Sequence, residues 1–135
     1  MNKLIIVGFI VLCLLSLNCT TKRGMGLGPV KDPLIMSDEL NIAIVDSGRV
    51  LFLDRCLKCH TTADNLKGPA LTKITERRRP EWIMNLLLNP TEMSAKDPFA
   101  KKTADNYGNT MKHYVFDYTE AREILEYFRF VDNNP

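Results

Sequence analysis

The residues with the clearest chemical meaning lie at positions 56 to 60, where the sequence reads C-L-K-C-H. Two cysteines three residues apart lie on one side of a helical turn, because residues at that spacing are neighbours on a helix surface. Both thiols can then form thioether bonds to the vinyl groups on one edge of a porphyrin, and the adjacent histidine can bind its iron. Cys56, Cys59 and His60 therefore have the spacing of a covalent attachment site for c-type haem.

Three other interpretations of this motif stay open on the residues alone. A C-x-x-C redox pair normally belongs to a βαβ unit, and the sequence shows no such pattern. A zinc site needs four ligands, and His113 could supply the fourth, although the set lacks the paired spacing of common zinc sites. A disulfide between Cys56 and Cys59 suits an exported protein but leaves His60 without a role. Haem attachment uses all three residues of the motif.

A haem iron bound by His60 needs a ligand on its other side. Met111, His113, Met93 and Met84 follow the motif and have side chains that bind haem iron. A thioether ligand raises the reduction potential, whereas a second imidazole lowers it. Met84 lies in an expected helix and is better explained as core packing, and Met93 could serve either role. Met111 is the preferred candidate, with His113 as the main alternative.

Helical patterns must position these residues. The spacing of apolar residues, together with proline and glycine signals, predicts helices over about residues 46–55, 80–88 and 119–131. Turn signals favour loops over residues 61–79 and 91–110. The sequence predicts an all-α domain of three to five helices. Long loops in so small a domain need an additional organiser, such as a bound cofactor.

The N-terminus has the features of an export signal. Lys3 precedes an almost purely apolar stretch over residues 4–17, which has the length of a signal-peptide core and is short for a membrane span. The sequence L-S-L-N-C, which ends at Cys19, resembles the lipobox of bacterial lipoproteins, in which the cysteine is lipidated and becomes the new N-terminus. We therefore expect a signal peptide over residues 1–18 and a lipid anchor on Cys19.

The remaining chain divides into a tether over residues 19–44 and a domain over residues 45–135. Glycines and prolines gather between residues 20 and 36, which favours flexible or extended backbone. A length of 135 residues fits one domain, and a net charge of +2 gives no basis for binding nucleic acid. The basic run Arg77–Arg79 is interpreted as a solvated surface patch.

From Val45 to Val131 the sequence resembles the class I, monohaem cytochromes c. The matching segments occur in family order and are Gly48 and Phe52 before the motif, Gly68-Pro69-Ala70-Leu71 after it, Pro80-Glu81-Trp82-Ile83, Asn89-Pro90, and Met111 ahead of the helix that carries Tyr127. The family fold is a small all-α domain wrapped around one covalently bound haem. Lys112 differs from the family, which usually has a proline directly after the methionine.

The resemblance implies a role for several of these residues. The carbonyl of Pro69 would accept the proton on the second ring nitrogen of His60, which would fix the ring and raise its basicity. Leu71 would line the haem pocket, and Tyr127 would pack closely over Gly48. Met111 would be the distal ligand.

An iron with both axial positions filled by the protein implies outer-sphere transfer of single electrons, so we expect an electron carrier and not an enzyme. Expected partners are redox proteins, namely an oxidase, a reductase or a quinol-oxidising complex. The chain would meet them on the periplasmic side of a bacterial membrane, held at its surface by the lipid. The alternative function is a haem enzyme or a sensor of gas or peroxide, which requires the distal ligand to leave the iron.

Overall fold

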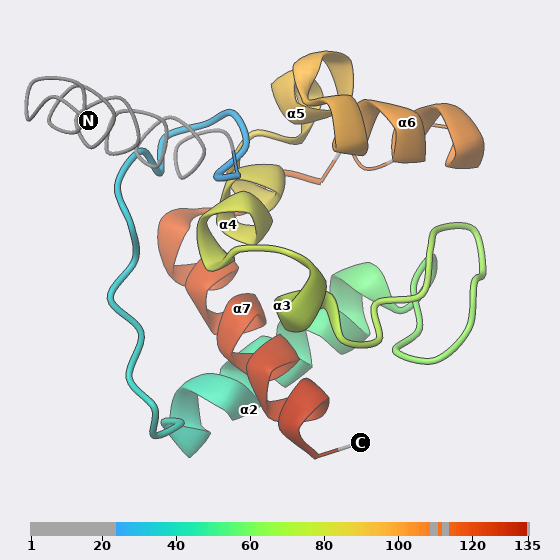
Figure 1. Cartoon of the computed structure of the whole chain (residues 1–135). Helices are drawn as coiled ribbons and strands as arrows, with labels where there is room; N and C mark the ends of the chain where they lie inside the picture. The colour runs from blue at the N-terminus through green and yellow to red at the C-terminus, as the bar shows by residue number, and fades with distance from the viewer. Residues whose placement is uncertain (1–23, 109–110, 112–113, 135) are drawn as a thin grey trace, which may run out of the picture.

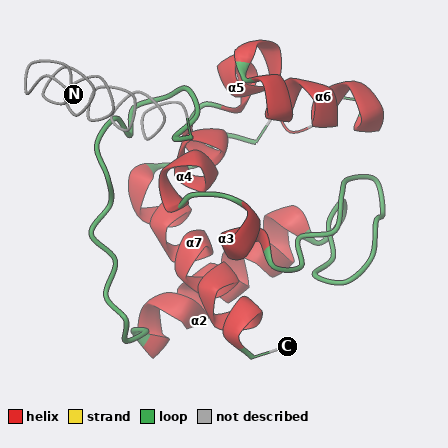
Figure 2. Cartoon of the chain, viewed as in Figure 1, coloured by secondary structure: helices red, strands yellow, loops and turns green. Residues whose placement is uncertain are grey.

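A computed structural model of the chain describes residues 24–108, 111 and 114–134. These residues form six α-helices and one π-helical turn, with no strand among them, which confirms the all-α prediction (Figure 1, Figure 2). The number of helices exceeds the predicted three to five. The elements are α2 (Ile42–Leu51), η1 (Phe52–Cys56), α3 (Ile74–Arg77), α4 (Pro80–Leu88), α5 (Pro90–Lys96), α6 (Pro98–Tyr107) and α7 (Tyr118–Asn133).

The additional helices lie where the sequence predicts loops, α3 within residues 61–79 and α5 and α6 over most of the described part of residues 91–110, so the loop prediction is wrong at these helices. Pro90 and Pro98 stand in the first turns of α5 and α6, where the missing N–H of proline costs nothing. Asp97 caps α6 by accepting hydrogen bonds from its first free amides. Gly108 ends α6 in the left-handed conformation, with a φ of 78°. Residues that look like helix breakers are therefore the start and stop signals of two short helices.

Helices α2 and α7 cross at Gly48, and this contact holds the segment that carries the cysteines. A Cβ atom at Gly48 would overlap the backbone carbonyl of Glu123 and would lie 3.0 Å from the amide nitrogen of Ile124. Close packing at Gly48 is thus confirmed, but the nearest atoms belong to the α7 backbone. Tyr127 packs on Phe52, with ring centroids 5.3 Å apart. Phe52, the first residue of η1, is only 2% exposed and anchors this turn in the core.

The start of α7 is tied to the end of η1. Asp117 and Glu120 form a capping box that satisfies free amides at the first turn of α7. Glu120 also accepts a charged hydrogen bond from Arg55, with 2.9 Å between Nη2 and Oε1. The Arg55 guanidinium lies over the Phe116 ring, 5.4 Å from its centroid. These contacts fix the turn directly before Cys56.

Residues 24–34, which we call the strap, run across α4 and α5. The Asn85 amide in α4 donates hydrogen bonds to the carbonyls of Met25 and Val30 and accepts one from the Val30 amide, all at 2.9 Å. Asn85, Met25 and Val30 are buried. This part of the expected tether is therefore fixed to the helices.

The end of the strap is held by a buried carboxylate. The Leu34 amide donates to Oε1 of Glu81 at 2.7 Å, and Arg79 donates to Oε2 at 3.0 Å. Burial alone would raise the pKa of Glu81, but the hydrogen bonds from Arg79, from Leu34 and from its own backbone outweigh burial and lower the pKa below its usual range. Among the described helices, none is long and apolar enough to cross a membrane.

Candidate functional site

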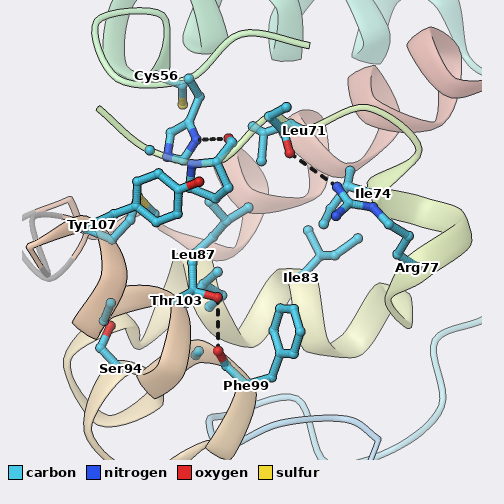
Figure 3. Close-up of a pocket in the computed structure, with 18 of the residues that line it drawn as sticks. Cys56, Leu71, Ile74, Arg77, Ile83, Leu87, Ser94, Phe99, Thr103 and Tyr107 are labelled. Atoms are coloured by element: carbon cyan, nitrogen blue, oxygen red, sulfur yellow. Dashed lines mark hydrogen bonds between the residues drawn. The ribbon is translucent and has the colours of Figure 1, made fainter. Parts of the chain in front are cut away.

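A mostly apolar cavity of about 210 Å³ lies between the π-helical turn η1, the loop over residues 61–73, α4 and α6 (Figure 3). The sequence-predicted residues Cys56, His60, Pro69, Leu71 and Met111 all line this cavity. Cys59 lines a smaller adjoining pocket, which shares Cys56, His60 and Met111 with the first. Folding thus brings together every predicted haem-site residue that the structure describes.

His60 is held in one orientation by its neighbours. Its side chain is buried, and Nδ1 lies 2.8 Å from the carbonyl oxygen of Pro69. Nδ1–H therefore donates to this carbonyl, and Nε2 keeps its lone pair for a metal. A Cβ atom at Gly68 would lie 2.8 Å from Nε2 and 2.9 Å from Nδ1, so a larger residue would displace the ring. The hydrogen bond that the resemblance implies is present, and Gly68 makes room for it.

The loop after the motif folds back onto it through backbone contacts. The Gly68 amide donates to the Cys59 carbonyl at 2.8 Å, and the Leu71 amide donates to the Thr61 carbonyl at 3.0 Å. Arg77 in α3 adds a side-chain hydrogen bond to the Ala70 carbonyl at 3.2 Å. These bonds place the Pro69 carbonyl beside His60 and Leu71 in the cavity wall.

The two cysteines lie on a tight turn and are not joined to each other. The amides of Cys59 and His60 both donate to the Cys56 carbonyl, at 3.0 and 2.9 Å. Both thiols are free, so the disulfide interpretation is wrong. Burial raises the pKa of the Cys56 thiol to about 11, against the opposing charge of Arg55. The thiol is therefore protonated at neutral pH, unlike the low-pKa thiolate of a redox pair.

The zinc interpretation has no structural support either. In the part of the chain that the structure describes, no three histidine, cysteine or carboxylate side chains are grouped so that they could hold a metal ion. His113, the proposed fourth ligand, lies outside the described residues.

The structure separates the candidate distal ligands. Met84 and Met93 are fully buried in the core and line neither pocket. The Met93 sulfur accepts a hydrogen bond from the Leu27 amide at 2.9 Å, which points it toward the strap. Met111 lines both pockets together with His60. Among the described candidates, Met111 is the methionine placed to reach a group bound by His60.

Helix α6 supplies a wall of the cavity that the sequence reasoning missed. Phe99, Thr103 and Tyr107 all line the cavity and recur at i, i+4 and i+8, which places them on one face of a helix (Figure 3). The spacing is visible in the sequence, but Pro98 and Gly108 are also typical of loops, so the sequence predicts a loop here. The missed helix therefore accounts for the missed wall.

The interpretation of the basic run Arg77–Arg79 as a solvated patch fits Arg77, which is exposed, whereas Arg78 and Arg79 are only partly exposed. Arg77 lines the cavity, and Arg79 pairs with the buried Glu81. The Arg78 guanidinium carbon lies 3.3 Å from the Phe99 ring centroid and 5.3 Å from the Trp82 ring centroid. Burial lowers the pKa of Arg78, and the neighbouring charge of Arg77 lowers it further, against the opposing charge of Asp97. Arg78 thus joins α6 to α4 through stacking on two rings.

Comparison with known proteins identifies this arrangement. The sequence model of the family described as cytochrome c matches residues 45–131. The chain belongs to the cytochrome c family. Cytochrome c from Rhodothermus marinus is 37% identical, and the match covers 80% of this chain and 92% of that chain with a TM-score of 0.75. An engineered form of the R. marinus protein, Rma TDE, is 36% identical over 79% of this chain and 92% of that chain, with a TM-score of 0.75.

A structure of Rma TDE bound to a carbene intermediate has the same identity and coverage, with a TM-score of 0.73. No curated protein matches the chain significantly.

Members of the cytochrome c family are haem-based electron carriers, and this cytochrome c binds haem c covalently. The described residues fit that group. The cavity wall is mostly apolar, both thiols are free to form thioethers, and His60 directs an unprotonated nitrogen away from the Pro69 carbonyl. A side chain at position 68 would fill the space that the imidazole occupies.

Proposed function

We propose that this cytochrome c is an exported monohaem protein that carries single electrons between redox partner proteins and is not an enzyme. Cys56 and Cys59 attach the haem, and His60 and Met111 bind its iron. The observation that carries the proposal is that Cys56, His60 and Met111 line one apolar cavity, that Cys59 lines the pocket adjoining it, and that His60 is fixed by the Pro69 carbonyl. Haem supplies an iron centre that takes up and releases one electron.

The residues of the chain determine how that centre behaves. The Pro69 carbonyl fixes the tautomer of His60 and increases the basicity of Nε2. A thioether from Met111 favours reduced iron and gives a higher potential than a second imidazole would. Leu71 and the apolar side chains of α4 exclude water from the cavity. If His60 and Met111 both bound the iron, the protein would leave no site on it for a substrate.

The N-terminal sequence supports export and anchoring. Residues 1–18 have the pattern of a signal peptide, and Cys19 stands at the lipobox position. A lipid on Cys19 would hold the protein on the periplasmic side of a bacterial membrane without a spanning helix. Its partners there would be an oxidase, a reductase or a quinol-oxidising complex.

Optical spectroscopy of the exported holoprotein tests the site. We expect a c-type pyridine haemochrome, together with the weak long-wavelength sulfur-to-iron band of methionine ligation in the oxidised protein. Met111→Ala should abolish this band. Met36→Ala is the matched control, because Met36 is partly buried against the core but lines neither pocket, and it should keep the band.

Other outcomes would replace parts of the proposal. Loss of covalent haem from the wild-type protein on denaturation would refute attachment at Cys56 and Cys59. A methionine band that persists in Met111→Ala would refute the distal ligand. A reversible spectral change on adding carbon monoxide to the reduced wild-type protein would favour the alternative, a haem enzyme or a gas or peroxide sensor.

A further inference from the structure

The strap is held against α4 and α5 almost from its first described residue. Asn85 binds the backbone at Met25 and Val30, and Met93 accepts the amide of Leu27. Glu81 then accepts the amide of Leu34. Three side chains of α4 and α5 thus bind the backbone between Met25 and Leu34, so this segment cannot swing away from the helices as a hinge would.

Two glycines of the strap serve this contact. Gly26 has a φ of 75°, and a Cβ atom there would lie 2.7 Å from Cε and 2.8 Å from Sδ of Met93. A Cβ atom at Gly28 would overlap the Asn85 amide. Because glycine lets the backbone approach the side chains of α4 and α5 this closely, the strap is a rigid part of the domain.

The strap therefore sets the length of any leash to a membrane anchor. This step rests on the proposed lipidation of Cys19. Only residues 20–24 separate Cys19 from Met25, and a fully extended chain covers this interval in about 20 Å. A domain of this length has a radius of gyration of about 13 Å and is about 34 Å across. The leash is therefore shorter than the domain is wide.

The strap and the haem-attachment motif lie on different sides of the domain. In Figure 1 the strap (blue) lies at the upper left beside α4 and α5, whereas the loop over residues 61–73 (light green) extends at the right. This loop begins directly after Cys59 and His60 and ends at α3. A short leash at the strap thus holds one side of the domain close to the lipid and keeps the other side away from it.

We infer that the strap and α5 face the bilayer, and that the side bearing Cys56, Cys59 and the loop over residues 61–73 faces the water. In this orientation the partner of the haem edge is a protein domain outside the membrane. A quinol dissolved in the lipid would have no access to that edge.

Site-specific labels on the full-length lipidated holoprotein test this orientation. Thr91→Cys places a thiol on α5, two residues from Met93, and Ala63→Cys places one on the loop after His60, both at exposed positions. With Cys19 lipidated and Cys56 and Cys59 bound to haem, the introduced thiol is the one available to a fluorescent maleimide. The protein is bound to phosphatidylethanolamine–phosphatidylglycerol vesicles, with and without a headgroup-labelled acceptor lipid. The fluorescence lifetime of the protein-bound label is measured with and without the acceptor lipid. The ratio of these two lifetimes reports transfer to the lipid alone, because quenching of the label within the protein affects both equally.

We expect energy transfer to the lipid to be several-fold stronger from position 91 than from position 63. As a control that keeps the strap intact, a Gly-Ser insert of about 20 residues after Cys19 adds a mean reach of roughly 25 Å. This insert should remove most of the difference between the two labels.

Equal transfer from both positions without the insert, or stronger transfer from position 63, would overturn the inferred orientation. A wild-type protein that does not bind vesicles, or binding that survives Cys19→Ser, would instead refute the lipid anchor, and the orientation would fall with it. Vesicle binding by the wild type that is lost in Cys19→Ser therefore establishes the anchor, and only then does the comparison of the two labels test the orientation.

Discussion

Replacing Asn85 with alanine should release the strap and destabilise the whole domain. Asn85 is fully buried, and its amide makes three hydrogen bonds of 2.9 Å to the strap backbone. The variant leaves one N–H and two carbonyls without partners, and each buried unsatisfied group costs about 1–3 kcal/mol. Water that enters the vacated space recovers part of this cost. We expect the free energy of unfolding to fall by about 3–5 kcal/mol, and Tm by roughly 12–20 °C for a domain of this size.

Urea unfolding of the holoprotein, followed by far-ultraviolet circular dichroism in a soluble Cys19→Ser background, measures this loss. The matched control is Asn133→Ala, at an exposed position at the end of α7, which should change the stability by less than about 0.5 kcal/mol. Trypsin reports on the strap directly, because Lys31 is exposed within it and should be cleaved faster once Asn85 is lost. If Asn85→Ala matches Asn133→Ala in both assays, the strap is not clamped and the reasoning fails.

A substitution that preserves size separates hydrogen bonding from cavity formation. Asn85→Asp keeps an acceptor for the Val30 amide but turns a carboxylate toward the carbonyls of Met25 and Val30. It should be as unstable as Asn85→Ala at neutral pH. Its stability relative to Asn85→Ala should rise on acidification, because a protonated carboxyl can donate one of the lost bonds. A stability gap between the two variants that does not change with pH would contradict this account.

Three further predictions follow from single contacts. Gly68→Ala should displace His60 and weaken its bond to iron, so that on acid titration the variant loses its low-spin spectrum at a higher pH than the wild type. The control is Gly108→Ala, because position 108 has open space around it. It should keep the wild-type spectrum and cost only about 1–2 kcal/mol of backbone strain. Gly48→Ala should force α2 and α7 apart and lower the free energy of unfolding by about 3 kcal/mol, measured by urea unfolding. Glu81→Gln should cost about 1.5–3 kcal/mol at neutral pH by losing its charged hydrogen bonds. Because the folded pKa of Glu81 lies below its usual value of 4.5, this cost should persist above pH 4.5 and disappear as the pH falls through the folded pKa.

Where a short stretch of sequence determines its own geometry, the structure agrees with the prediction. The helix predicted over residues 80–88 is present with those bounds, because Pro80 starts it and Pro90 begins the next helix. The C-terminal helix extends the predicted range by one or two residues at each end. The helix before the motif begins earlier than predicted, because the Asn41 side chain caps its first amides.

The errors concern residues whose meaning depends on distant partners. Gly26 and Gly28 favour flexible or extended backbone on the sequence alone, which gives no sign that Gly26 lies against Met93 and Gly28 against Asn85. The arginines at 77–79 look like a solvated run, yet Arg78 stacks on the ring of Phe99, which lies on another helix. A glycine or an arginine has the same appearance in a sequence whether it is free or packed. Whether such a residue is packed depends on the side chain or backbone it contacts, and here that contact comes from a distant part of the sequence.

The haem site has one half built from contacts that are local in the sequence and another half built from contacts between distant segments. Residues 56–71 form the half that holds His60, and its hydrogen bonds join residues no more than about ten positions apart. The C-x-x-C-H motif predicts Cys56, Cys59 and His60, and the family resemblance implies the contact between His60 and Pro69. The opposite half combines Thr103 and Tyr107 on α6 with Leu87 on α4 and with Met111, and α6 is held against α4 by the stacking of Arg78 on Phe99 and Trp82. Because this half exists only when α4, α5 and α6 are packed, and the strap binds α4 and α5 on their other side, loss of the strap should disturb the Met111 side before the His60 side.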